Sequence, residues 1–466
     1  MNSEDSDKDG KYTDSDDGNA HVSATTTTST TSSLPNRNWL TDTCTTDIDT
    51  VDRHDPLVQE WIATIHYAVT QAGITLLDTA PWYGHGISEQ VVGLALEEIF
   101  CSETWNDKNS KNNQQKQQQQ HDATDTTPTL QSTSQSRITR QDIMVNTKVG
   151  RYEAHPTRQF DFSREATLAS VQRSLQRLRT PYVNVLQLHD PEFASALGEV
   201  LLSETIPALL ECRARGYCRA LGLTGYPLSV QRQILDATAA HFRGVPMDVD
   251  VWDQCLTYGH YNLHDTTLLR QPGSLLQQPQ QQQQSSTCES SFAEYCRAQN
   301  IVCLAAAPLS MGLLTPTACP PAWHPASPQL KEACRRAADM CRRATNVNLA
   351  DLALLFALAE PRIPVTIVGM KDMAQVQTVQ RLCQRLQNAN FVLSQALTVE
   401  EQRVMEQLQD AVHGPFADVW KSKQQYYHWD GLVQVREFWK SVPGASIPTW
   451  QQEQARGDSA EEALSE

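Results

Sequence analysis

The chain has 466 residues, and its 38 Lys and Arg against 54 Asp and Glu give a net charge of −16. That balance argues against a general nucleic-acid binder, which needs basic surface, and against docking on an anionic membrane. No run reaches the roughly 18 apolar residues of a membrane helix, and the acidic start carries no secretory or transit-peptide pattern. The twelve cysteines are scattered without metal-ligand spacing, which favours reduced thiols in a cytosolic protein.

Four segments are too polar or too repetitive to bury a core. Residues 1–50 contain an unbroken Thr/Ser run, residues 101–138 and 272–290 contain Gln runs, and residues 412–466 end in an acidic tail. We predict that 1–50 is a disordered acidic tail, that 101–138 and 272–290 are low-complexity insertions, and that 412–466 is a polar C-terminal extension. One large α/β domain over residues 51–411 remains.

The first element expected in this domain is a helix. Asp55 is a good N-cap, Pro56 suits the first turn, and apolar residues recur every three or four positions until Gly73. A second helix is predicted to begin at Ser163. Apolar runs of strand length occur at Ile74–Thr79, Ile143–Val149, Tyr182–His189, Ala220–Gly225, Met247–Trp252, Ile301–Pro308 and Val365–Gly369. Their apolar residues are consecutive, as in strands buried on both faces.

Helices and buried strands alternate along the domain, which predicts a parallel sheet with helices outside. Seven such strands favour an eight-stranded (β/α)8 barrel with one strand unassigned. An open doubly wound sheet is the competing architecture, but no GxGxxG follows any strand. The unassigned strand is the first, because only Trp39–Leu40 and Ile48–Val51 precede the first helix, and neither resembles a buried strand. Either a poor strand closes the barrel, or the chain lacks a normal N-terminal segment.

Polar residues stand where three of the strands end, which is where the active sites of such barrels lie. They are Asp78, Lys148 and His189, and Tyr83 follows Asp78 by five positions. Each alone has an ordinary structural explanation: a helix cap, a lysine that reaches solvent, a core histidine. Together at one barrel mouth they indicate proton transfer, because a Lys cation favours the phenolate form of Tyr and an Asp holds the Lys in place.

Longer motifs around these residues resemble the aldo-keto reductases. They are GITLLDTAPWYGHGISEQVVGLAL (73–96), VNTKVGRY (145–152) and VLQLHDPEF (185–193). Further stretches narrow the resemblance to the L-galactose dehydrogenase (aldose 1-dehydrogenase) branch, among them ETIPALLECRARGYCRALGLTGYPL (204–228), YGHYNLHDTTLL (258–269) and APLSMGLLT (307–315). The resemblance covers about residues 56–390 and implies an aldo-keto reductase barrel with an Asp78, Tyr83, Lys148 and His189 tetrad.

The resemblance implies oxidation of an aldose at C1 to an aldonolactone, as in ascorbate-type biosynthesis, with a nicotinamide as hydride acceptor. Tyr83 would take the proton of the C1 hydroxyl, Lys148 would depress the Tyr83 pKa, and Asp78 would anchor Lys148. His189 would hydrogen-bond the reacting oxygen. Trp82, Trp323 and His324 are available to line the sugar, and ordinary loop packing is an equally good explanation for them.

The cofactor end is also assigned from the resemblance. The residues expected near the dinucleotide are Thr224, Gly225, Tyr258, Ala307, Pro308, Leu309, Met311, Gly312, Leu313, Gly369, Met370, Lys371 and Gln375. A helix beginning near Asp372 would offer its N-terminus to a phosphate. Gln375 stands where NADP-dependent relatives carry an Arg, which favours NAD over NADP, although the ammonium of Lys371 is close in sequence.

Three other functions compete with a cytosolic sugar dehydrogenase. An NADPH-dependent carbonyl reductase fits the same scaffold, and a non-catalytic module that senses nicotinamide and regulates a partner would suit the low-complexity insertions. A metal-dependent hydrolase using Asp78, His189 and Asp190 is disfavoured by a Lys and a Tyr at the same mouth. The partner expected is thus a small aldose, with no metal, nucleic acid or membrane, and the sequence leaves the oligomeric state open.

Overall fold

The protein is described from a computed structural model. The residues it describes are 51–101, 138–153, 159–194, 199–243, 250–270, 290–318, 320, 324 and 326–421. The predicted tail 1–50 lies outside the described residues, and so do the two predicted insertions apart from their end residues. Residues 422–466, most of the predicted C-terminal extension, lie outside them as well.

Seven strands form one sheet in which every strand runs parallel to the next along the chain. They are β1 (Leu76–Asp78), β2 (Met144–Val149), β3 (Val183–His189), β4 (Cys218–Gly225), β5 (Gln254–Tyr258), β6 (Val302–Ala306) and β7 (Val365–Ile367). The sheet curls into the barrel that the alternation of helices and strands predicted. Because all seven strands point the same way, their carboxyl ends meet at one mouth.

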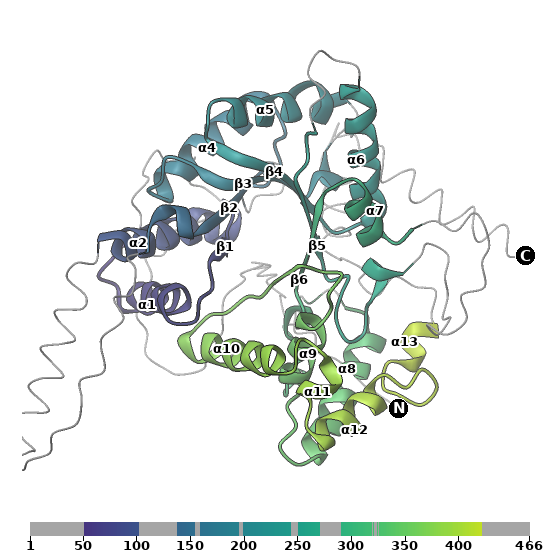
Figure 1. Cartoon of the computed structure of the whole chain (residues 1–466). Helices are drawn as coiled ribbons and strands as arrows, with labels where there is room; N and C mark the ends of the chain where they lie inside the picture. Colours follow the sequence, from purple (N-terminus) through teal and green to yellow (C-terminus); the bar gives the residue numbers. More distant parts are fainter. Residues whose placement is uncertain are drawn as a thin grey trace, which may run out of the picture. The chain divides into compact units, whose positions relative to one another are not determined.

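Helices cover the outside of this sheet, and Figure 1 shows α4, α5 and α6 lying outside β2–β5. The helices are α1 (Pro56–Thr70), α2 (Ile87–Cys101), α4 (Arg164–Arg177), α5 (Ile206–Ala214), α6 (Leu228–Phe242), α7 (Phe292–Ala298), α8 (Pro328–Arg343), α9 (Leu349–Leu358), α10 (Met373–Asn388), α11 (Leu393–Ala396), α12 (Val399–Leu408) and α13 (Ala417–Lys421). None of the described helices is long and apolar enough to cross a membrane.

The helix starts predicted from capping residues are confirmed. Asp55 accepts the N–H of Leu57 at the start of α1, and Ser163 accepts the N–H of Ala166 at the start of α4. Gly73 lies just beyond the end of α1 with φ 69°, a left-handed conformation that glycine adopts without strain.

The fifth strand is not where the hydrophobic run placed it. Met247–Trp252 was the predicted strand, but the strand is Gln254–Tyr258, and Val251 and Trp252 instead pack into the main core. Hydrophobicity was misleading here because the strand turns a polar side chain into the barrel. Gln254 donates a hydrogen bond from Nε2 to Oε1 of Gln187 at 3.1 Å.

The first strand of an eight-stranded barrel would lie between β7 and β1, and within the described residues these two strands are not paired with each other. The helix layer is nevertheless joined at this point. Tyr67 of α1 donates to Oε1 of Gln380 of α10 at 3.2 Å, and Gln380 donates to the carbonyl of Gln71 at 2.8 Å. The strand candidates before residue 51 fall outside the described residues.

The packed part of the chain continues past residue 411. Phe416, Val419 and Trp420 are buried against α8 and α9, and the indole of Trp420 donates to the carbonyl of His264 at 2.8 Å. Part of the first ten residues of the predicted polar extension therefore packs against the folded core. Eight cysteines within the described residues are free thiols, as expected.

Candidate active site

Three strands deliver the predicted tetrad to the barrel mouth. Asp78 ends β1, Lys148 is the penultimate residue of β2, and His189 ends β3. Tyr83 begins the turn that follows β1, whose next residues Gly84 and His85 have left-handed φ angles of 61° and 52°. The structure thus brings the four predicted residues to one mouth.

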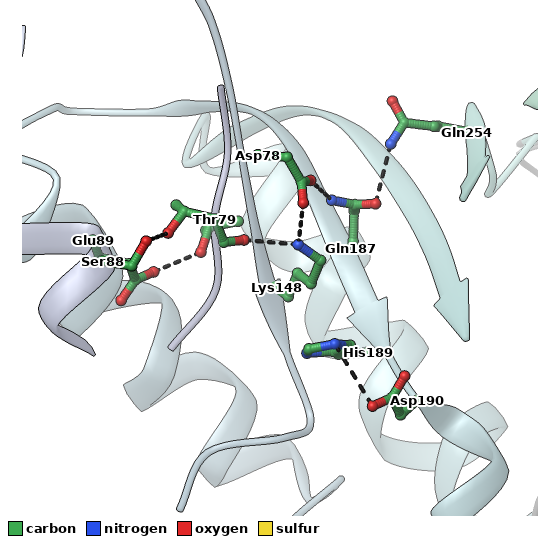
Figure 2. A network of polar contacts seen from close by, with 10 residues as sticks. Asp78, Thr79, Ser88, Glu89, Lys148, Gln187, His189, Asp190 and Gln254 are labelled. Carbon is green, nitrogen blue, oxygen red and sulfur yellow. Dashed lines mark hydrogen bonds and ion pairs between the residues drawn. The ribbon is translucent and has the colours of Figure 1, made fainter. Parts of the chain in front are cut away.

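The ammonium of Lys148 is the centre of this group, as Figure 2 shows. Its Nζ donates to Oδ2 of Asp78 at 2.6 Å and to the carbonyl of Thr79 at 2.9 Å. The two charged side chains are only 1% and 6% exposed. Burial works against the charge on Lys148, but Asp78 and Tyr83 outweigh it, so the pKa of Lys148 is raised and its charge is secure. A buried pair of this kind is poor evidence for stability and good evidence for a site.

Two glutamines that the sequence did not reveal continue the network from Asp78. Gln187 donates to Oδ1 of Asp78 at 2.8 Å and accepts the hydrogen bond of Gln254, so that β1, β3 and β5 are linked across the barrel interior. Both carboxylate oxygens of Asp78 are therefore engaged. Gln187 lies two positions before His189 in β3, and that period of two along a strand was the signal that it shares the inner face.

Tyr83 lies over this ion pair. The Lys148 ammonium is 4.7 Å from the centre of its ring, and the whole residue is 38% exposed at the mouth. Burial raises the pKa of the Tyr83 phenol, and the Lys148 ammonium lowers it but does not offset the rise completely. The expected depression of the Tyr83 pKa by Lys148 is thus present as one contribution, while the net direction is upward.

His189 stands next to Tyr83, with their rings edge to face and 6.2 Å apart. Burial lowers the pKa of His189 to about 3, with the cations of Lys148 and Arg151 adding to the effect and the Asp190 carboxylate opposing it. The imidazole is therefore neutral at physiological pH. Its Nδ1 is buried without a hydrogen-bond partner among the described residues, so a neutral hydrogen-bonding group is available beside the phenol.

A buried carboxyl supports the end of β4, where Thr224 and Gly225 were expected to meet the nicotinamide. Glu192 accepts the N–H of Tyr226 at 3.0 Å, and a Cβ on residue 225 would lie 2.5 Å from its Oε2, so a larger residue there would displace the Glu192 carboxyl. Burial, with the nearby Asp190 carboxylate, raises the pKa of Glu192 to about 8. Neither Glu192 nor its contact with Gly225 was anticipated from the sequence.

The remaining strand ends carry the residues expected to hold the dinucleotide. Tyr258 ends β5, and burial raises its pKa. Ala307, Ser310, Met311 and Gly312 of the loop after β6 have φ angles between 50° and 94°, so this loop is tightly coiled. Pro308, Leu309 and Leu313 lie in the same loop. Leu313 is buried in a hydrophobic cluster with residues of α8, α9 and α12.

The segment after β7 is exposed at Gly369 and Lys371. Asp372 caps α10, as predicted, by accepting the N–H of Gln375 at 2.9 Å. The Gln375 side chain folds back to accept the N–H of Lys371 at 2.9 Å, and Met370 packs near the cluster formed by α9 and α10. The backbone N–H groups of Met373 and Ala374 have no acceptor in the part of the chain that the structure describes.

The three residues expected to line the sugar have different fates. Trp82 lies at the mouth, half-buried, with the Arg151 guanidinium 3.9 Å from its ring centre. His324 is 2% exposed, and its two ring nitrogens contact the carbonyl of Ser310 and the N–H of Ala326 at 3.1 and 3.0 Å. That packing favours the ordinary structural explanation for His324. Trp323 lies outside the described residues.

Within the described residues, no three His, Cys, Asp or Glu side chains gather as a metal site requires. Asp190, a ligand in the hydrolase alternative, instead accepts a hydrogen bond from Arg151 at 2.7 Å. The geometry thus gives no support to that alternative.

The chain is similar to known proteins. The sequence matches the family model described as "Aldo/keto reductase family" over residues 56–249 and 273–393. It is 32% identical over 316 residues to the L-galactose dehydrogenase of Arabidopsis thaliana, covering 68% of this chain and 75% of that protein. It is 27% identical over 315 residues to the D-arabinose 1-dehydrogenase of Saccharomyces cerevisiae, with 67% and 73% covered.

Among solved structures, the glycerol dehydrogenase of Gluconobacter oxydans is similar with a TM-score of 0.46 and 20% identity, over 77% of this chain and 88% of that one. The family match begins at the first residue of α1 and runs through α10. The chain therefore belongs to the aldo/keto reductase family and is an NAD(P)-dependent oxidoreductase.

Proposed function

We propose that this chain is an aldose 1-dehydrogenase that oxidises the C1 hydroxyl of an L-galactose-type sugar to a lactone and prefers NAD to NADP. The observation that carries the proposal is the buried Lys148–Asp78 pair with the Tyr83 ring above it and neutral His189 beside it. The names of similar proteins, L-galactose dehydrogenase, D-arabinose 1-dehydrogenase and D-threo-aldose 1-dehydrogenase, support a sugar as the substrate.

In this proposal Tyr83 accepts the proton of the C1 hydroxyl. Lys148 stabilises the phenolate electrostatically, and Asp78 keeps Lys148 charged and fixed. His189 is neutral, so it can hydrogen-bond the reacting oxygen without adding a charge to the site. Because the pKa of Tyr83 is raised, sugar oxidation should become faster as the pH rises and the phenolate forms.

The residues at the ends of β4 to β7 fit a dinucleotide. Gly312 and Gly369 face open space where a side chain would otherwise stand, and the two N–H groups without acceptors at the start of α10 suit a phosphate. We assign Thr224, Gly225 and Tyr258 to the nicotinamide end, and Ala307–Leu313 and Gly369–Gln375 to the phosphates and adenosine. The bound nicotinamide would supply the hydride acceptor.

The preference for NAD is supported by the charge at the start of α10. Gln375 is neutral and its side-chain oxygen is already used by the N–H of Lys371. The N-cap residue Asp372 adds a carboxylate at the same place, which would repel a 2′-phosphate. Lys371 is the cation close by, and it is a point charge without the paired donors of a guanidinium.

We further propose a cytosolic enzyme that acts in an ascorbate-type pathway. Its free cysteines suit a reducing compartment, and the similarity to an L-galactose dehydrogenase supports the pathway.

The test is steady-state reduction of NAD and of NADP by a panel of free aldoses, with the product identified by mass spectrometry. We expect a lactone from an L-galactose-type sugar with NAD, and a loss of turnover in Tyr83→Phe. Reduction of simple aldehydes with NADPH but no oxidation of any aldose would contradict the proposal and favour the carbonyl reductase. Tight binding of the nicotinamide without turnover would favour the sensing module.

A further inference from the structure

A second polar cluster lies beside the tetrad, and we call Trp82, Arg151 and Asp190 the rim cluster. Its members follow the strands that carry the tetrad: Trp82 comes after β1, Arg151 after β2 and Asp190 after β3. The guanidinium of Arg151 donates to Oδ2 of Asp190 at 2.7 Å and lies 3.9 Å from the ring centre of Trp82. One cation thus joins an aromatic face to a carboxylate.

The backbone aims Asp190 at the tetrad. Asp190 has φ 49° and ψ 52°, a left-handed conformation that non-glycine residues rarely adopt. Two hydrogen bonds hold it there: its N–H donates to the carbonyl of Thr224 at 2.8 Å, and its carbonyl accepts the N–H of Phe193 at 3.1 Å. As a result Oδ2 lies 3.6 Å from Nε2 of His189, as Figure 2 shows.

The other oxygen of this carboxylate is available. Oδ1 of Asp190 has no hydrogen-bond partner among the described residues, and the side chain is 15% exposed. Asp190 also acts on the phenols of the mouth. Burial is the main cause of the raised pKa of Tyr83 and of Tyr258, and the Asp190 carboxylate adds to both. An acceptor without a partner among the described residues therefore lies beside His189 and acts on the phenols of the mouth.

Arg151 is fixed on several sides. One orientation of the Gln159 side-chain amide satisfies both of its polar atoms. In that orientation its oxygen accepts hydrogen bonds from Nη2 and Nε of Arg151 at 2.9 and 3.2 Å. The guanidinium also stacks near Phe160, 5.4 Å from that ring centre. A cation held in this way keeps both Trp82 and Asp190 in position.

We propose that Asp190 determines specificity by accepting the hydroxyl groups next to the reacting carbon, with Trp82 as the apolar platform under the sugar ring and Arg151 as the positioning residue. A sugar presents hydroxyl donors at its edge and C–H groups on its face, and a carboxylate next to an aromatic ring matches both. The inference rests on the proposed function and deepens it, because it explains why a polyhydroxylated substrate would be preferred to a simple aldehyde.

The test compares Asp190→Asn and Arg151→Met with wild type on an aldose, on its 2-deoxy counterpart and on a simple aldehyde. We expect Asp190→Asn to raise KM for the aldose by about 10- to 100-fold, the loss of one charge-assisted hydrogen bond, in addition to a change that all three substrates share through the pKa of Tyr83. The 2-deoxy sugar and the aldehyde should show only the shared change. Equal effects on all three substrates would overturn the proposal and show a structural role.

Arg151→Met tests the positioning role through a second measurement. Its loss leaves Asp190 uncompensated beside His189, so the pKa of His189 should rise, and the pH profile of the His189 imidazole, followed by NMR, should move to higher pH. Arg151→Lys should restore the charge and much of the profile, but not the stacking on Trp82. Arg213→Met is the matched control, since Arg213 forms a similar pair with Asp253 at 3.5 Å and is not part of the mouth. An unmoved profile in Arg151→Met would overturn this role.

Calorimetric titration with the same sugars separates this inference from the proposed function. Aldose binding that weakens in Asp190→Asn, without turnover in wild type, would retain the inference and refute the dehydrogenase. Aldose oxidation and binding that are unchanged in Asp190→Asn would retain the dehydrogenase and refute the inference. Absence of any aldose binding by wild type would overturn the inference itself.

Discussion

One end of the barrel mouth lies at the ends of β1 to β3, and the other lies at the start of α10. The two ends are built in opposite ways. At the ends of β1 to β3, the Lys148–Asp78 pair is almost fully buried, and its hydrogen bonds join residues 69 to 109 positions apart. At the start of α10, Lys371 and Gln375 are exposed, and their hydrogen bonds span only three or four positions. The whole barrel sets the geometry of the first end, whereas a single turn of chain sets the second. Substitutions at the first end should abolish activity or destabilise the fold, and substitutions at the second end should change the preference between the two cofactors.

The largest effect is expected for Tyr83→Phe. The change removes the proposed proton acceptor and leaves the ring over Lys148, so sugar oxidation should fall by 10²–10⁴-fold, as is usual for loss of a general base. Binding of NAD, measured by quenching of protein fluorescence, should survive. In wild type kcat/KM should rise with pH, because burial raises the pKa of Tyr83, and the rise should vanish in the variant. A variant that keeps more than about one hundredth of the wild-type rate would contradict this role.

The next effect is on stability. Lys148→Met would leave the Asp78 carboxylate buried without its cation, which should lower the free energy of unfolding by about 3–5 kcal/mol. Arg381→Met is the matched control, because Arg381 forms an exposed pair with Asp351 at 3.2 Å and should cost at most about 1 kcal/mol. Urea unfolding of both variants measures the difference. Similar losses of unfolding free energy in the two variants would show that the buried Lys148–Asp78 pair matters no more for stability than an exposed pair.

A third test uses the buried carboxyl behind β4. The pKa of Glu192 is raised from 4.5 to about 8, mainly by burial, so the folded protein keeps a proton that the unfolded chain loses. Stability contributed in this way is fully present below pH 4.5 and is lost as the pH rises to about 8. Glu192→Gln cannot ionise, and its free energy of unfolding should therefore fall less than that of wild type across this window. Parallel pH profiles of the two proteins would contradict the raised pKa.

The smallest effect is expected at the exposed end. Gln375→Arg adds a guanidinium where a 2′-phosphate would lie, and it should shift the ratio of kcat/KM values toward NADP by about ten- to hundredfold. The kcat with saturating NAD should not change. Lys371→Ala tests whether the neighbouring ammonium already serves this purpose. Better use of NADP than of NAD by wild type, and its collapse in Lys371→Ala, would show that Lys371 binds the phosphate.

The sequence was informative where chemistry coincides with the ends of strands. Asp78, Lys148 and His189 could be located because a parallel sheet brings all its carboxyl ends together, whatever the details of packing. Gln254 could not, because its importance depends on barrel curvature that brings β5 within reach of β3, and the apolar run before it misplaced the strand.

Of the rim cluster, only Trp82 was predicted to line the sugar, and Arg151 and Asp190 were missed as substrate residues. Asp190 follows His189 directly, but its direction depends on a left-handed backbone that the sequence does not announce. For His324 the sequence left sugar lining and loop packing open, and the hydrogen bonds of its ring to the loop backbone favour loop packing.

The unpaired sides of β1 and β7 have a consequence for the protein in solution. A closed barrel has no free sheet edge, whereas β1 and β7 are not paired with each other within the described residues, and a sheet edge without a partner strand favours association with another molecule. The net charge of −16 opposes the approach of a second copy. Salt weakens that repulsion, since charges are screened within about 8 Å at physiological ionic strength. At high protein concentration, a higher ionic strength should therefore make self-association easier.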